Sequence, residues 1–172
     1  MPVDHLNIVE RKLIDNLRTG TYNTTAGTST AWSSSDVTVF GQFPTTDQTK
    51  YPAIITEMSA NGIETQYFGQ DITFGSSNTQ AKGELYGVAF NIHLMVDRDC
   101  SITIDGEPYK ERRLLNYLML NGANVLMDVD YSATTTEVVE RHFTGFTDIG
   151  YNPELEIWAA MATMVIVFKN NR

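Results

Sequence analysis

The stretch "LEIWAAMATMVIVFKNNR", residues 155–172, decides how the chain folds, because within it residues 157–168 are all apolar except Thr163. A run of this kind can belong to a membrane anchor, to a buried helix or to a strand inside a sheet. A helix that crosses a bilayer needs about 20 predominantly apolar residues. Glu156 and Lys169 bound this run far short of that length, so we do not expect a membrane anchor.

The surroundings of the run favour a strand over a helix. Upstream, "YNPE" at 151–154 supplies turn-forming residues, and downstream "MVIVF" at 164–168 is rich in the β-branched and aromatic residues that pack well on a pleated sheet. We therefore expect a long, mostly buried strand from Leu155 to Phe168. Three small side chains in it would leave room for a helix to lie against the sheet: Ala159, Ala160 and Ala162.

Composition limits the class of protein. With 172 residues and 42% hydrophobic content, the chain is expected to form one domain around a single core. A net charge of −9, from 12 basic and 21 acidic residues, counts against a surface that binds nucleic-acid phosphates. The single cysteine, Cys100, excludes an internal disulfide and a paired-cysteine metal motif. Residues 1–17 lack the apolar core of a signal peptide, so we expect an intracellular origin.

The clearest strand pattern is "GELYGVAFNIHLMVD" at 83–97, where apolar residues alternate with others. Six of them share one face, which we expect to face the core: Tyr86, Val88, Phe90, Ile92, Leu94 and Val96. The opposite face is mixed in character, as expected of a face that is half exposed or that meets another subunit: Leu85, Gly87, Ala89, Asn91, His93 and Met95.

Further strands and loops follow from local composition. We expect strands at 37–43, 51–58 and 134–150, and the last of these should form a hairpin with the final strand across the "YNPE" turn. The Thr- and Ser-rich stretch at 20–36 predicts an exposed loop. The Ser-, Asn- and Gln-rich stretch at 69–83 predicts a long protruding hairpin loop, and long loops in compact domains are usually functional or disordered.

The first helix is predicted near the beginning of the chain. Apolar residues recur there at intervals of three and four: Leu6, Val9, Leu13 and Leu17. Asp4 is a suitable N-cap, and Gly20 lies where a helix ends in a left-handed residue.

A second helix is predicted after the Asp105-Gly106 turn, with Pro108 near its first position and Gly122 at its end. Its apolar side would face the sheet through Leu114, Leu115, Tyr117 and Leu118, while Lys110, Arg112 and Arg113 would point largely outward. The order of elements predicts an α+β fold: a mixed, mainly antiparallel sheet with two helices on one face.

Catalytic signatures are not found in the sequence. The three histidines, His5, His93 and His142, fall on different predicted elements, and the common hydrolase, metalloprotease and nucleotide-binding motifs are not present. We therefore expect no catalytic residues, no metal and no cofactor. One alternative stays open, because His93 and Asp97 lie on the same face of a strand and could form an acid–base or metal-binding pair.

Acidic residues lie beside the single cysteine, and four aspartates form a possible cation site. Asp97 and Asp99 lie beside Cys100, and negative charge near a thiol raises its pKa and opposes a role as nucleophile. The same two carboxylates, with Asp128 and Asp130, could gather around a cation, but the spacing of a calcium-binding loop is not present. We expect an unreactive cysteine and a solvated acidic surface.

The order of elements resembles that of the tail terminator proteins of long-tailed phages. The resemblance rests on the opening helix, on "YPAIITEM" at 51–58 as an "FPAV"-like strand, and on a Gly/Ser-rich hairpin loop that leads into "GELYGVAFNIHLMV" at 83–96. It continues through a helix after a short acidic connection to "GFTDIGYNPELEIWAAMATMVIVFK" at 145–169, where a Trp precedes small residues and a β-branched ending. The Thr/Ser-rich insert at 21–49 is longer than this family usually carries.

The resemblance implies a virion protein without catalytic activity. Its copies, usually six, would form a ring that caps the tail tube, ends tube polymerisation and joins the tail to the capsid neck. The implied partners are other copies of the chain, the tail tube protein and a head-completion or neck protein, with genomic DNA passing through the channel without specific binding. The protein would be assembled in the host cytoplasm.

Two other classes of function stay open. Within virion assembly, the chain could be a neck or head-completion protein or a tail-tube subunit, because fold does not separate these roles. From a different class, it could be a small intracellular enzyme or a ligand-binding module that uses His93 and Asp97.

Two sets of contact residues are predicted for the ring. The polar loop at 69–83 can become ordered when it docks, and we expect it to touch the tail tube or a neighbouring subunit. The residues expected to make this contact are Asp71, Ile72, Thr73, Phe74 and Lys82. The expected interface between subunits contains Asn91, His93, Arg112 and Arg113. The acidic net charge suggests a channel wall that repels phosphates weakly.

Overall fold

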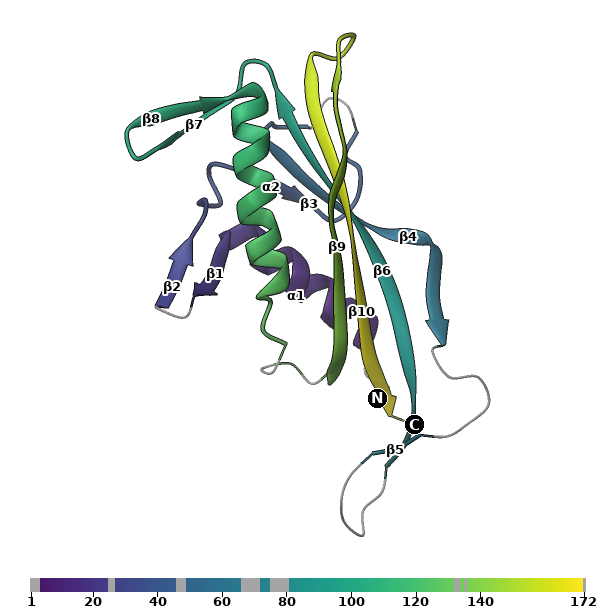
Figure 1. Ribbon diagram of the computed structural model, residues 1–172. Coiled ribbons are helices and arrows are strands. Elements are labelled where there is room, and N and C mark those ends of the chain that lie inside the picture. Colours follow the sequence, from purple (N-terminus) through teal and green to yellow (C-terminus); the bar gives the residue numbers. More distant parts are fainter. Residues whose placement is uncertain are drawn as a thin grey trace.

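The computed structural model describes residues 4–24, 27–45, 49–65, 72–74, 81–131, 134 and 136–171. Two helices and ten strands follow one another in these residues: α1 (His5–Thr19), β1 (Thr21–Thr24), β2 (Gly27–Thr30), β3 (Thr38–Phe40), β4 (Ala53–Thr65), β5 (Ile72–Phe74), β6 (Ala81–Asp97), β7 (Ser101–Ile104), β8 (Glu107–Lys110), α2 (Glu111–Met127), β9 (Val138–Asn152) and β10 (Ile157–Asn171) (Figure 1).

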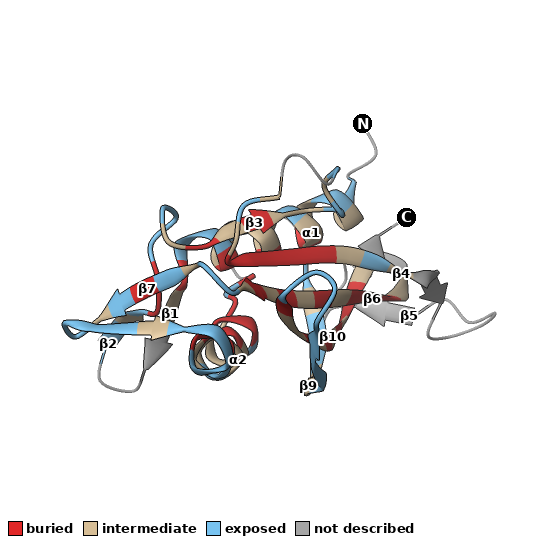
Figure 2. Ribbon diagram, turned by 90° about the horizontal axis from the view of Figure 1, so that it is seen from above, coloured by how far each residue is buried: buried red, intermediate tan, exposed pale blue. Residues whose placement is uncertain are grey.

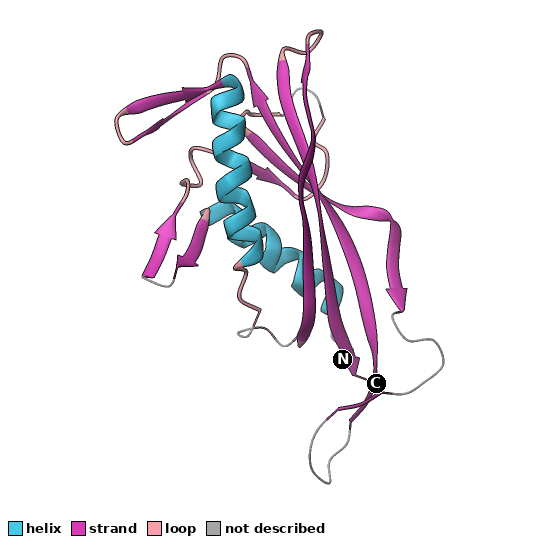
Figure 3. Cartoon of the chain, in the orientation of Figure 1, coloured by secondary structure: helices cyan, strands magenta, loops and turns pink. Residues whose placement is uncertain are grey.

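A six-stranded sheet forms the centre of the molecule. Its strand order is β3-β4-β6-β10-β9, and the short β5 pairs with the beginning of β6. Every pair is antiparallel except β3 with β4, which run parallel. Both helices contribute to a core on one face of this sheet, as Figure 3 illustrates. The predicted α+β class, with a mixed, mainly antiparallel sheet and two helices on one face, is confirmed.

Strands β6 and β10 hold the sheet together. Their ladder is continuous, from Ile157 opposite Asp97 to Asn171 opposite Gly83. The predicted core face of β6 is confirmed, because Val88, Phe90, Ile92, Leu94 and Val96 are each 0% exposed. Figure 2 shows the buried residues concentrated in the central strands and in α2.

The apolar run that opened the sequence analysis is a strand, as predicted, but its bounds differ. β10 begins at Ile157, because Leu155 lies in the preceding turn with 62% of its surface exposed. Two of the three alanines, Ala160 and Ala162, are buried on the side where α2 packs, as expected. Ala159 is different: it lies opposite Met95 and therefore belongs to the other face.

Helix α1 begins and ends where the sequence predicts. The Asp4 carboxylate accepts a hydrogen bond from the Asn7 amide at 3.1 Å, which caps one of the first free amides of the helix. Gly20 follows the helix in a left-handed conformation (φ 57°). A Cβ at Gly20 would lie 2.6 Å from the Trp32 carbonyl oxygen, so glycine is required by both conformation and space.

The predicted ends of the second helix are wrong, although its buried side is correct. Pro108 lies in β8, and Gly122 lies inside α2, where a Cβ would be 3.5 Å from the Phe146 ring. Proline suits a short strand at this position because β8 pairs only with β7. On the expected apolar side, Leu114, Leu115 and Leu118 are each 0% exposed, and Tyr117 is half-buried.

The prediction of an exposed loop at 20–36 is partly wrong. Gly27, Thr28, Thr30 and residues 33–35 are exposed as expected, but the segment contains the β1–β2 hairpin and the buried Trp32, which is 2% exposed. The Trp32 indole nitrogen donates to the Leu17 carbonyl at 2.8 Å, and the Tyr117 hydroxyl donates to the Ala31 carbonyl. Two aromatic side chains thus hold a polar segment against the helices, and composition alone does not reveal this.

Strand β9 begins at Val138 and not at Thr134. The Thr134 hydroxyl donates to the backbone carbonyls of Tyr131 (2.7 Å) and Thr136 (2.9 Å), which stabilises a turn in place of a strand.

Along β9 the register with β10 shifts three times, and each shift places an extra residue in β9. Such bulges bend an edge strand and oppose its pairing with another chain.

Candidate functional site

The predicted loop contacts fall only partly within the described residues. Ile72–Phe74 form β5, which pairs with the beginning of β6 so that Thr73 lies opposite Lys82. Asp71 and residues 75–80 lie outside the described part of the chain, and so does the tip of the predicted protruding loop. The structure therefore places the base of this connection as a short hairpin that continues the central sheet.

Asn91 and His93 lie on the face of β6 that points away from the helices. We call this surface the open face; its half-buried members are Leu85, Ala89, Asn91, His93, Met95, Ala159, Met161, Thr163 and Val165. The connection between β3 and β4 covers part of it, because the Phe43 ring lies 4.9 Å from the His93 ring. On β4, the same face carries Ala53 and Ile55, which are buried (0% and 1% exposed), and the charged Glu57. The half-buried members on β6 and β10 are not covered by either helix.

Polar side chains on the open face are paired with one another. His93 Nε2 lies 3.1 Å from the Glu57 carboxylate, and the Thr163 hydroxyl donates to the Asn91 side-chain oxygen at 3.3 Å. The hypothesised partner of His93, Asp97, instead accepts a hydrogen bond from the Asp99 amide at 2.7 Å. No group of three or more potential metal ligands is found among the described residues.

Arg112 and Arg113 lie in the first turn of α2, on the helix side of the sheet. The Arg113 guanidinium lies 4.0 Å from the centre of the Tyr109 ring, and that of Arg112 lies 5.9 Å from the centre of the Trp158 ring. Tyr151 packs on Trp158 with ring centres 5.1 Å apart. We call these five residues the arginine–aromatic cluster. Exposed cation–π contacts of this kind contribute about 0.5–1 kcal/mol each.

The four residues predicted as one subunit interface therefore lie on two surfaces. Asn91 and His93 belong to the open face, while Arg112 and Arg113 lie on the other side of the sheet, because Trp158 pairs with Val96 of the core face. An assembly whose subunits meet head to tail uses two different surfaces of each subunit. The separation is compatible with such an assembly.

Most charges at the ends of α2 oppose its dipole, and the exception is Glu111, an acidic residue in the first turn. Arg112 and Arg113 lie at the positive end, the N-cap residue Lys110 makes no side-chain cap, and Glu111 at the helix start has a positive φ of 48°. At the negative end, Asp128 is the C-cap residue and the last turn contains no basic residue. Each unfavourable charge costs about 0.3–1 kcal/mol at an exposed position. This arrangement does not follow from the predicted helix, whose start lay near Pro108 and not at Glu111.

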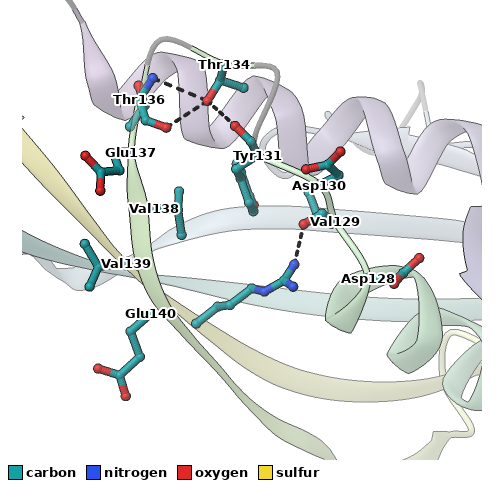
Figure 4. A pocket seen from close by; sticks show the side chains of 11 residues that line it. Asp128, Val129, Asp130, Tyr131, Thr134, Thr136, Glu137, Val138, Val139 and Glu140 are labelled. Atoms are coloured by element: carbon teal, nitrogen blue, oxygen red, sulfur yellow. Dashed lines mark hydrogen bonds between the residues drawn. The ribbon is translucent and has the colours of Figure 1, made fainter.

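The other end of α2 adjoins a hollow of about 730 Å³ (Figure 4). We call it the acidic hollow, because its lining includes four carboxylates and one cation: Asp128, Asp130, Glu137, Glu140 and Arg141. The cationic side chain, Arg141, already forms a hydrogen bond within the subunit, because its guanidinium donates to the Val129 carbonyl. Glu137 forms an ion pair with Lys169.

Tyr131 also lines the hollow, and it is 6% exposed. Its buried hydroxyl has no hydrogen-bond partner among the described residues, and burial raises the pKa of Tyr131 above its ordinary value. The phenol therefore stays neutral and contributes no negative charge to the hollow at neutral pH.

The pKa of the Cys100 thiol is raised, as predicted from the neighbouring carboxylates, but mainly by burial, which was not part of that prediction. Burial is the main cause that raises the pKa of the thiol to about 11, and the charges of Asp97 and Asp99 add to this. The Cys100 sulfur also donates to the Asp97 carbonyl at 3.0 Å. The predicted direction of the pKa shift agrees with the structure, but desolvation outweighs the neighbouring carboxylates.

In the described part of the chain, neither helix has the length and apolar character needed to cross a membrane. The chain matches no model of a known protein family, and a search of curated proteins finds no similar sequence.

Proposed function

We propose that this protein is a structural subunit of a phage particle, a tail terminator whose copies form a closed ring. The ring, with six copies in the family that the chain resembles, caps the tail tube, ends tube polymerisation and joins the tail to the capsid neck. The observation that carries the proposal is the difference between the two faces of the central sheet. One face is buried under α1 and α2, while the open face combines the buried Ala53 and Ile55 of β4 with half-buried, mainly apolar residues of β6 and β10.

A half-buried, mainly apolar surface with internally paired polar groups suits contact with another protein. Such interfaces combine an apolar centre with hydrogen-bonded polar groups. The open face has apolar members such as Met95, Met161 and Val165, and its polar members Asn91 and His93 have partners within the chain. A partner that covers this face would thus leave neither side chain without a hydrogen bond.

The edges of the sheet support an assembly of limited size. At one edge, β3 pairs with β4 over only three residues, and at the other edge β9 has three bulges. Regular exposed edges promote unlimited strand pairing between chains, and bulges prevent it. Contacts through side-chain surfaces are therefore favoured over a continuous sheet that grows from subunit to subunit.

The order of elements also supports the proposal. The elements on which the resemblance to tail terminators rests occur in the expected order: α1, β4, β5 with the beginning of β6, the rest of β6, α2 and the β9–β10 hairpin. The additional strands β1, β2 and β3 follow α1, and β7 and β8 precede α2. The net charge of −9 suits a channel through which DNA passes without binding.

Removal of the protein from an infecting phage tests the capping role. Without the cap, tail tubes should vary in length and exceed the normal length, and filled heads should remain unattached. Wild-type protein supplied in trans should restore tails of normal length. Tails of normal length joined to heads in the absence of the protein would contradict the proposal.

Labelling of the protein in intact particles separates the terminator from a tube subunit. A tag on the exposed β7–β8 turn at Asp105-Gly106 should be seen only where the tail meets the head. A signal repeated along the whole tail would instead identify a tube subunit.

A further inference from the structure

We propose that the arginine–aromatic cluster of one copy docks into the acidic hollow of the next copy. This inference rests on the proposed ring and specifies which surfaces of successive subunits meet. The cluster lies at the beginning of α2 and the hollow at its end, so a single helix has both halves of the contact at its two ends (Figure 1).

The arginines are positioned for a partner outside the subunit. Arg112 and Arg113 are exposed, and neither forms an ion pair with a carboxylate in the described part of the chain. The rings of Trp158 and Tyr109 hold their guanidinium groups. A side chain that is already held loses less entropy when it binds. Tryptophan, tyrosine and arginine are also the residues most enriched at the energetic centres of protein interfaces.

Their placement also works against the stability of the subunit. Arg112 and Arg113 in the first turn and Asp128 at the C-cap oppose the dipole of α2, and Glu111 in the first turn offsets only part of this charge. Glu111 also has a strained, positive φ of 48°. Positions where local rules are broken tend to be functional. A neighbouring copy would reverse the effect, because its carboxylates would neutralise the arginines at the positive end of the helix.

The hollow supplies the complementary charge. Asp130, Glu137 and Glu140 are exposed at its rim, Glu137 is paired with Lys169, and the Arg141 guanidinium donates to the Val129 carbonyl. Figure 4 shows these carboxylates spread around the lining instead of pointing at a common centre. This arrangement suits two guanidinium groups that arrive side by side, because arginine pairs with carboxylates through a planar fork of N–H donors.

The geometry of the contact leads to a ring or a filament. A helix of 17 residues is about 25 Å long, so the two surfaces are well separated and cannot meet within one subunit. A contact between two different surfaces is heterologous, and repeated heterologous contacts close into a ring when the rotation between successive copies completes a turn.

Charge reversal in the cluster tests the contact. The variant Arg112→Glu/Arg113→Glu should lose the oligomer, with an apparent dissociation constant raised at least about tenfold in analytical ultracentrifugation, since loss of charge pairs in an interface slows association and speeds dissociation. Its melting temperature at a concentration where both proteins are monomeric should stay close to that of the wild type, because acidic residues at the beginning of a helix offset the loss of the two cation–π contacts. A purely structural role for the arginines predicts a lower melting temperature.

Reversal of the hollow provides the complementary experiment. Asp130→Lys/Glu140→Lys should also lose the oligomer, and the chain that carries all four changes should assemble again. The matched control is Arg11→Glu/Arg18→Glu, which changes the charge equally on the exposed side of α1 and should leave assembly unchanged.

Failure of this contact can be told apart from failure of the ring itself. If wild-type rings form and Arg112→Glu/Arg113→Glu assembles equally well, or if the four-fold variant folds but does not reassemble, the contact is wrong and the ring stands. If the wild-type protein forms no oligomer alone or with tail tubes, both the ring and this contact are overturned.

Discussion

The two faces of strand β6 differ sharply although they belong to one strand. On the helix side, Val88, Phe90 and Ile92 are completely buried. On the open face, their immediate neighbours Ala89, Asn91 and His93 are half-buried. Alternation along a strand thus produces one face that completes its packing within the subunit and one that does not. The first face determines stability, and we infer that the second serves assembly.

The difference also lies in the type of side chain. The buried face uses large aliphatic and aromatic residues that interlock with α1 and α2, whereas the open face uses small, flexible or hydrogen-bonded residues such as Ala89, Met161 and Thr163. Unbranched methionine adapts to different partner shapes. Side chains of this kind can be exposed to solvent in the isolated subunit and can pack against a partner in the assembly.

The largest effect is expected on the buried face. Phe90→Ala should lower the free energy of unfolding by about 3–5 kcal/mol, because it removes a fully buried ring and leaves a cavity. Urea denaturation followed by tryptophan fluorescence measures this. A loss below about 1 kcal/mol would mean that the core does not pack around β6 as described.

A smaller effect is expected at the boundary of the core. Trp32→Phe should lower the free energy of unfolding by about 1–3 kcal/mol, because it removes the 2.8 Å hydrogen bond to the buried Leu17 carbonyl and leaves only the longer contact of 3.3 Å from the Gly20 amide. Trp158→Phe is the control, since it removes an indole from the partly exposed cluster, and its effect on the isolated subunit should be smaller. Equal losses for the two variants would show that Trp32 is not a structural anchor.

On the open face the effect on the isolated subunit should be smaller still. Met161→Ala should change the free energy of unfolding by less than about 1 kcal/mol, because the side chain is only half-buried. The same change should weaken incorporation into particles, which can be measured by competition with wild-type protein during tail assembly. Full incorporation would argue that the open face is solvent-exposed in the particle.

The smallest effect concerns Cys100. Because the pKa of its thiol is raised from 9.0 to about 11, the thiolate fraction near neutral pH falls about 100-fold. A thiol reagent should therefore react about 100-fold more slowly with the folded protein than with the protein in urea.

The sign of the pH dependence follows from the same shift. The unfolded thiol ionises before the folded one, so the free energy of unfolding is unaffected by Cys100 below about pH 9 and decreases as the pH rises towards 11. Cys100→Ser should remove this decrease, and an unchanged pH profile in that variant would assign it to other groups.

Much of the fold follows from periodicity in the sequence. The alternation at 83–97 and the helical spacing of Leu6, Val9, Leu13 and Leu17 give the correct elements and the correct buried sides. The ends of elements and the segment before β3 could not be predicted in the same way. There, a few tertiary contacts decide the structure, such as the Trp32 indole on the Leu17 carbonyl and the Phe146 ring over Gly122.

The candidate surfaces were only partly predictable. The sequence identifies Arg112 and Arg113 as outward-facing and Asn91 and His93 as members of a mixed face, but it does not show that the sheet separates the two pairs. The acidic hollow depends on the turn between α2 and β9, where threonine hydroxyls replace the strand that alternation had suggested. Local hydrogen bonds of this kind leave no periodic signal.

The methionines provide the most direct test of the account, because they sample both faces of the sheet. Met95 and Met161 lie on the open face, while Met164 is 1% exposed on the buried face. Peroxide oxidation followed by peptide mass spectrometry should modify Met95 and Met161 in the isolated subunit but leave them protected in intact particles, with Met164 protected in both. Oxidation of Met95 and Met161 at the same rate in particles as in the isolated subunit would contradict the claim that assembly covers the open face.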